Sequence, residues 1–177
     1  MNKPYNPFYV FRITLVATLG GLLFGYDTAV VSGTVDSISK VFIEPRHLNE
    51  TAANSLLGFC VASALIGCII GGVISGYLSN RFGRRNSLLF AALLFFIAAL
   101  GSAYPEFGLH PILSNQYPTY LTNYIPEFVA YRIIGGIGVG LASMLSPMYI
   151  AEVAPAEIRG KLVSFNQFAI IFGQLLV

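Results

Sequence analysis

Long runs without a charged residue constrain this chain more than any other feature of its sequence. Residues 51–80, 86–105, 133–151 and 162–177 contain no Asp, Glu, Lys or Arg, and residues 13–31 contain only Asp27. The hydrocarbon core of a bilayer is about 30 Å thick, and a helix needs about 20 apolar residues to cross it. Four of the runs reach that length, whereas residues 162–177 suffice only for the beginning of a span.

The runs are expected to be helices. Strands of a membrane barrel alternate apolar and polar residues over about 10 positions, whereas residues 88–96 are apolar throughout. A helix also satisfies its own backbone hydrogen bonds in lipid. We therefore predict an all-α integral membrane protein with four full transmembrane helices and a truncated fifth. The predicted helices cover about residues 10–32, 53–79, 87–104, 127–147 and 157–177.

Composition excludes several classes of protein. Charged residues make up 10% of the chain, against about 25% in a soluble domain, so a soluble enzyme and a nucleic-acid-binding protein are poor interpretations. The chain is expected to contact membrane lipid. Cys60 and Cys68 lie inside one apolar run, without the spacing of a disulfide framework or a metal site. His47 and His110 fall in predicted outer loops, so we expect no enzyme, metal or cofactor.

The basic residues indicate an orientation. Seven of them fall on one side of the predicted membrane and two on the other. The seven are Lys3, Arg12, Arg81, Arg84, Arg85, Arg159 and Lys161, and the two are Lys40 and Arg46. Cytoplasmic loops collect Lys and Arg, so we predict a multi-pass protein of the cell inner membrane with a cytoplasmic N-terminus.

Glycines recur at four-residue spacing within two of the spans. Gly67-x-x-x-Gly71 and Gly72-x-x-x-Gly76 lie in the second span, and this spacing lets two helices approach closely in lipid. We favour packing within the chain over dimerisation. The glycines of residues 135–140 lie inside a membrane-length run, without the strand that precedes a dinucleotide-binding loop.

Two charged residues fall inside predicted spans, where a charge is costly. At 1.5 Å per residue, Asp27 lies about 6 Å below the outer end of the first span, and Arg132 lies about 8 Å inside the fourth. The two could therefore pair. A static structural pair and a carboxylate that alternates between protonated and Arg-paired states are both open, since a buried carboxylate takes up a proton readily unless a cation is close.

Residue spacing places further notable side chains on two helix faces. Phe24 lies three residues before Asp27 and shares its helix face. Gln167 and Gln174 are seven residues apart and share a face of the last span. Amides in membrane helices face a polar cavity or a partner helix, and both alternatives are open for these two.

Three segments resemble a known family. They are residues 76–85, residues 132–140 with the following Pro147, Tyr149, Glu152 and Arg159-Gly160, and residues 19–27. Together they are similar to the sugar porters of the major facilitator superfamily. The acid at position 27 favours a proton-coupled member, since facilitative glucose carriers usually have a neutral residue there. The resemblance implies proton-coupled symport of a pentose or hexose such as D-xylose by alternating access.

The resemblance also implies roles for individual residues. Asp27 is the expected proton-coupling acid and Arg132 its partner. Phe24, Gln167 and Gln174 are the expected sugar contacts, and Arg84, Glu152 and Arg159 the expected cytoplasmic charge cluster that latches the outward-facing state. Asn80 stands where the superfamily motif usually has Asp, which predicts a weaker latch.

Members of this family have twelve spans in two halves that hold the sugar between them. The chain resembles the N-terminal half, over residues 1–177, without the sixth helix and the C-terminal half. We therefore expect a truncated reading frame or a fragment that needs the missing half and is inactive alone. The alternative is a small structural or partner-binding membrane protein without transport activity.

Overall fold

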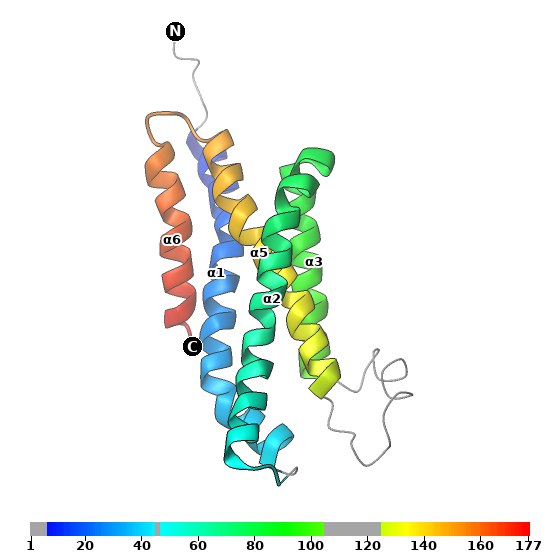
Figure 1. The fold of residues 1–177 in the computed structure, drawn as a ribbon. Helices are drawn as coiled ribbons and strands as arrows, with labels where there is room; N and C mark the ends of the chain where they lie inside the picture. The colour runs from blue at the N-terminus through cyan, green and yellow to red at the C-terminus, as the bar shows by residue number, and fades with distance from the viewer. Residues whose placement is uncertain (1–6, 45–46, 105–124) are drawn as a thin grey trace.

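The computed structural model describes residues 7–44, 47–104 and 125–177. Five α-helices in these ranges form an all-α bundle (Figure 1). They are α1 (Pro7–Ile38), α2 (Glu50–Phe82), α3 (Arg84–Ala103), α5 (Ile125–Val153) and α6 (Arg159–Leu175), and a short π-helical segment, η1 (Ser39–Ile43), follows α1. The first four α-helices are long and apolar enough to cross a membrane, and α6 has 17 residues. The predicted fold class is confirmed.

The helices extend beyond the charge-free runs. The first helix begins before Arg12, and α2 includes Arg81 in its last turn. Long basic side chains lie along apolar surface and hold their charge in the polar interface, so a helix continues past the last residue that lies in hydrocarbon. A charge-free run therefore marks the membrane-embedded part of a helix better than it marks the ends of the helix.

Two turns lie at the end of the bundle where α1 begins (Figure 1). Helix α2 ends at Phe82 and is followed by Gly83, whose φ of 80° is positive and whose N–H donates to the Ser79 carbonyl over 3.1 Å. Only glycine adopts this conformation without steric cost, so α3 can begin at the next residue. Helix α5 ends just before Pro155, which has no N–H to continue a helix.

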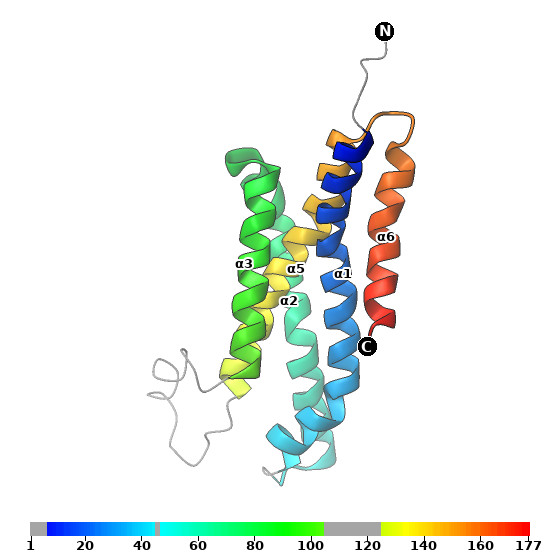
Figure 2. The ribbon, with the colours of Figure 1, turned by 180° about the vertical axis from the view of Figure 1, so that it is seen from behind.

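Helix α5 is the centre of the bundle and contacts α1, α2, α3 and α6. Figures 1 and 2 show it crossing obliquely, from beside α1 and α6 at one end to beside α3 at the other. Leu141 and Leu145 of α5 pack with Ala91 of α3 in a fully buried cluster. Residues of α5 can therefore meet both α1 and α6, which positions the candidate site.

Glycines bring α2 and α5 into backbone contact. A Cβ atom on Gly67 or Gly71 would collide with the carbonyls of Ile133 and Ile137, and one on Gly136 or Gly140 with those of Ala64 and Cys68. The first glycine motif therefore packs helices within the chain, as predicted. Among residues 7–44, 47–104 and 125–177, a Cβ atom on Gly72 or Gly76 meets nothing within 4 Å, so the second motif packs no helix of this described part.

Glycines also bring α1 against α6. A Cβ atom on Gly25 would collide with the Ile170 carbonyl, and one on Gly173 would collide with the Leu22 carbonyl. Side chains flanking these glycines are consequently held at a fixed spacing between the two helices. The outward faces of the bundle are apolar, as in Leu65, Ile69 and Val73 of α2, which are 64%, 68% and 78% exposed. Such a surface suits lipid or further apolar helices.

Candidate functional site

The structure brings Asp27 of α1 and Arg132 of α5 into an ion pair. Nη1 of Arg132 donates to both carboxylate oxygens of Asp27, over 3.1 and 3.3 Å. The Arg132 side chain is 12% exposed and that of Asp27 is 30% exposed. Nε of Arg132 is buried and has no hydrogen-bond partner in the described ranges. The guanidinium therefore has donor capacity beyond its contact with this carboxylate.

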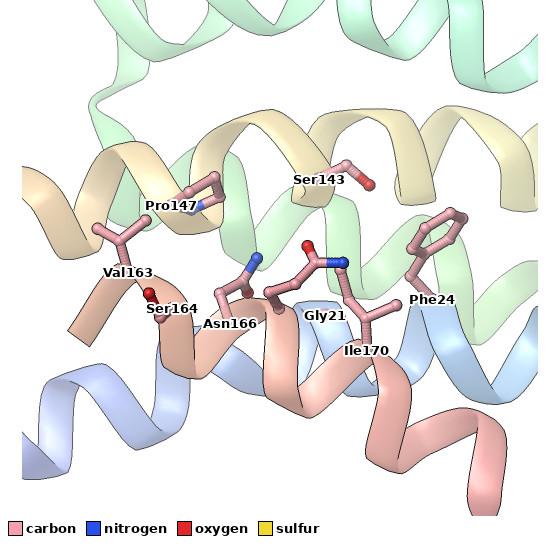
Figure 3. Close-up of a pocket in the computed structure, with 9 residues that line it drawn as sticks. Gly21, Phe24, Ser143, Pro147, Val163, Ser164, Asn166 and Ile170 are labelled. Carbon is pink, nitrogen blue, oxygen red and sulfur yellow. The ribbon is translucent and has the colours of Figure 1, made fainter. Parts of the chain in front are cut away.

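A pocket opens one helical turn from Asp27, between α1, α5 and α6 (Figure 3). Its volume is about 370 Å³, which is at the small end of the 300–1,000 Å³ typical of small-molecule sites. Nine residues line it: Gly21, Phe24, Ser143, Pro147, Val163, Ser164, Asn166, Gln167 and Ile170. An aromatic ring beside amide and hydroxyl groups suits a ligand that has both apolar faces and hydroxyls.

Two of the three predicted sugar contacts lie in this pocket. Phe24 and Gln167 line it from opposite helices, α1 and α6. Gln174 does not line it, because it lies two turns further along α6, where it is exposed. The helix face that Gln167 and Gln174 share is therefore longer than the pocket.

A buried polar junction supports one wall of the pocket and was missed in the sequence. Ser146 of α5 lies within hydrogen-bond distance of the Ala17 carbonyl of α1 and, at 2.9 Å, of the Asn166 side-chain oxygen of α6. Ser146 is fully buried and Asn166 is 6% exposed. The junction joins three helices, α1, α5 and α6. The sequence feature that could have indicated it is Asn166, a second amide side chain next to Gln167 in an otherwise apolar run.

Pro147 is a second feature that the sequence analysis left without a role. It lies inside α5, and because proline has no N–H it leaves the carbonyl of the residue four positions earlier without its helical donor. That residue is Ser143, and both Ser143 and Pro147 line the pocket. The backbone carbonyl of Ser143 therefore lacks its usual helical donor at a position beside the pocket.

The three predicted members of the charge cluster are only partly brought together. Arg84 pairs with Glu152, with Nε and Nη2 at 2.9 and 2.8 Å from Oε1. Nη1 of Arg84 also donates to the Ser79 carbonyl, at 3.4 Å. Arg159 instead donates to the Ala154 carbonyl, at 3.5 Å, and forms no ion pair within the described ranges. The cluster therefore ties α3 to α5, while Arg159 contacts the end of α5.

Sequence comparisons identify the relatives of the chain. The model of the family described as Sugar (and other) transporter matches residues 13–177. The D-xylose-proton symporter of Escherichia coli K12 is 75% identical over all of this chain and 36% of its own length. The glucose facilitated diffusion protein of Zymomonas mobilis is 42% identical over 99% of this chain and 35% of its own length.

Solved structures show the same fold. The inward-open xylose transporter XylE of E. coli has a TM-score of 0.85 at 75% identity, over 95% of this chain and 38% of that one. XylE bound to 6-bromo-6-deoxy-D-glucose has a TM-score of 0.88 at 74% identity, over 97% of this chain and 36% of that one. The chain spans about a third of the length of the curated relatives it matches. It belongs to the sugar transporter family of the major facilitator superfamily.

Proposed function

We propose that residues 1–177 form the N-terminal part of a proton-coupled symporter for D-xylose or a similar monosaccharide. The observation that carries this proposal is the Asp27–Arg132 ion pair, which lies in the membrane-embedded part of α1 and α5, one turn from a pocket that combines apolar side chains with amide and hydroxyl groups. A purely structural bundle has no need of charges at this depth, where they are costly.

Asp27 is the proton carrier in this proposal. In its ionised form it accepts two hydrogen bonds from Arg132. Protonation removes the charge that holds the guanidinium and frees α1 from α5 at this point. Since Phe24 shares the helix face of Asp27 and lines the pocket, a ligand in the pocket and a proton on Asp27 act on the same segment of α1.

The Gln167 amide contacts hydroxyl groups of the sugar in the pocket, and the Gln174 amide contacts sugar hydroxyls further along α6. The names of the relatives support a sugar as the ligand: two of them are D-xylose-proton symporters of E. coli, and another is an arabinose-proton symporter of Bacillus subtilis. Because these proteins are about three times as long as this chain, alternating access is proposed to require a second bundle that rocks against this one around a shared site.

The charge distribution supports a cytoplasmic N-terminus in the cell inner membrane. The start of α1 and the two turns at Gly83 and Pro155 lie at one end of the bundle (Figure 1), and this end carries most of the basic residues. The Arg84–Glu152 pair is then a cytoplasmic contact between α3 and α5, suited to holding the outward-facing state.

The experiment uses a chimera in which residues 1–177 replace the matching segment of the E. coli D-xylose-proton symporter. The purified chimera is reconstituted, and proton-driven xylose accumulation is measured beside xylose exchange without a gradient. Asp27→Asn should abolish accumulation and retain part of the exchange, because the amide keeps the shape but cannot cycle a charge. Asp36→Asn, at an exposed acid of the same helix, should retain both.

A structural role for the ion pair predicts a different result. Removing one partner of a buried pair costs about 3–5 kcal/mol, because the other charge stays buried. Joint loss of folded protein, exchange and accumulation in Asp27→Asn would therefore contradict the proposal, as would accumulation that persists.

A further inference from the structure

The hydroxyl of Ser146 lies between two oxygen atoms of neighbouring helices. It is 2.5 Å from the Ala17 carbonyl of α1 and 2.9 Å from the side-chain oxygen of Asn166 in α6. A serine hydroxyl has one hydrogen to donate, and a carbonyl can only accept. Two oxygens at the shorter distance would repel each other without a hydrogen between them, so Ser146 donates to Ala17. Toward Asn166, the Ser146 oxygen is therefore an acceptor.

This assignment determines which end of the Asn166 amide faces Ser146. The oxygen and nitrogen of an amide have nearly the same outline, and their hydrogen-bond partners tell them apart. The Ser146 oxygen needs a donor, and the amide nitrogen is the side-chain group of Asn166 that can donate. The two amide atoms therefore exchange places, so that the nitrogen faces Ser146 and the oxygen points away. Asn166 then donates to Ser146, and Ser146 donates to Ala17.

The two ends of the Asn166 amide have different surroundings. The end that faces Ser146 is enclosed, because a Cβ atom added to Gly21 would lie 2.8 Å from it. The other end makes no hydrogen bond within the described part of the chain, where Nε of Arg132 is the only fully enclosed side-chain atom that lacks a partner. This end is consequently open. Asn166 lines the pocket and reaches from α6 toward α5 (Figure 3), so the open end belongs to the pocket wall.

Gln167 lines the same pocket without such a constraint. It is exposed and makes no hydrogen bond among the described residues, so its amide can present either its donor or its acceptor end to a ligand. Asn166 can present only its oxygen. The two neighbouring amides of α6 therefore differ in what they can recognise, although their chemistry is the same.

We infer that Ser146 fixes the Asn166 amide with its oxygen toward the pocket, and that Asn166 thereby selects a sugar hydroxyl that donates a hydrogen bond. Asn166 is a specificity-determining residue in this inference, and Ser146 is a positioning residue that acts through it. The inference rests on the proposed function and deepens it, because it assigns a donor requirement to one hydroxyl of the sugar held beside Phe24 and Gln167.

The test uses D-xylose analogues in which one hydroxyl at carbon 2, 3 or 4 is replaced by fluorine, which cannot donate a hydrogen bond. Half-saturating concentrations for exchange are measured on the reconstituted chimera without a proton gradient. At one or more positions, fluorine should raise this value about threefold to tenfold, the effect of one lost hydrogen bond. In Ser146→Ala the amide can turn over, so at one such position the fluorine analogue and xylose should agree within twofold.

Ser63→Ala is the matched control. Ser63 of α2 is fully buried like Ser146, and its hydroxyl donates to the Cys60 carbonyl of its own helix at 2.8 Å. This variant should keep the fluorine effect at every position. If Ser146→Ala does not fold, Asn166→Leu takes its place, because it removes the acceptor and should also abolish the effect at one position.

Three results would overturn the inference. They are the absence of any fluorine effect in the chimera, a fluorine effect that persists at every position in Ser146→Ala and Asn166→Leu, and a Ser146→Ala protein that binds all the sugars more weakly by one common factor. The last result would show that the junction is only structural. Exchange requires no coupling, so a chimera that shows the fluorine effect but never accumulates xylose would overturn proton symport and support the role of Asn166.

Discussion

Replacing Gly25 with alanine should separate α1 from α6, whereas the same change at Gly20 should not. Both glycines lie in α1, so the gain in intrinsic helix stability from alanine is similar and cancels in the comparison. A Cβ atom on Gly25 would overlap the backbone carbonyl of Ile170, which cannot rotate away. A Cβ atom on Gly20 would lie 3.4 Å from the Ala142 Cβ atom, an ordinary contact.

The expected difference follows from overpacking. Adding a methyl group to a filled interface costs about 1–3 kcal/mol, and moving α6 outward also weakens the reciprocal contact of Gly173 with Leu22. Gly25→Ala should therefore be about 1–3 kcal/mol less stable than Gly20→Ala. It should also bind xylose more weakly, since the shift moves Gln167 away from Phe24 across the pocket.

The assay is thermal unfolding of the two purified chimera variants in the same detergent, with xylose binding measured on each. The unfolding midpoint temperatures of the two variants can be compared directly, because both variants are made in the same chimera. Equal midpoints, or a lower midpoint for Gly20→Ala, would refute the backbone contact between α1 and α6 on which the geometry of the pocket depends.

Three further predictions concern other parts of the chain. In a background without Cys60 and Cys68, cysteine at Lys40 should react with an impermeant thiol reagent from outside the cell and cysteine at Asn80 should not; reversed labelling would overturn the orientation. A double-mutant cycle on the Arg84–Glu152 pair should give a coupling of about 0.2–1 kcal/mol that weakens in salt, because the two side chains are 33% and 45% exposed. A polypeptide of residues 1–177 alone, reconstituted in liposomes, should show no proton-dependent xylose accumulation, and saturable accumulation would contradict the need for a second bundle.

The membrane fold could be predicted from the sequence because the bilayer imposes a length on every charge-free run. The pairing of Asp27 with Arg132 could be anticipated for a related reason. The depth of a residue in the membrane follows from its distance along the helix to the end of the span, and the two residues lie at similar depths below the outer ends of their spans. Packing at Gly67 and Gly71 followed from the steric rule for close helices.

Features that depend on which helix faces meet could not be predicted in this way. The junction of Ser146, Asn166 and Ala17 joins α1, α5 and α6. The periodicity of a helix shows which residues share a face, but it does not determine which face of a neighbouring helix they meet. For the same reason Gly72 and Gly76 have the spacing of a packing motif but face no neighbouring helix in the part of the chain that the structure describes. Arg159 was grouped with Glu152 by the resemblance, and it contacts the Ala154 carbonyl instead.

Simultaneous measurement of proton and xylose movement tests whether Asp27 carries the coupled proton. Weakly buffered proteoliposomes that contain the chimera are given xylose, and external pH is followed together with sugar entry. If Asp27 carries the proton, the medium becomes alkaline as xylose enters, and Asp27→Asn removes this signal while xylose still exchanges across the membrane. Alkalinisation that persists in Asp27→Asn, in proportion to xylose entry, would contradict this role.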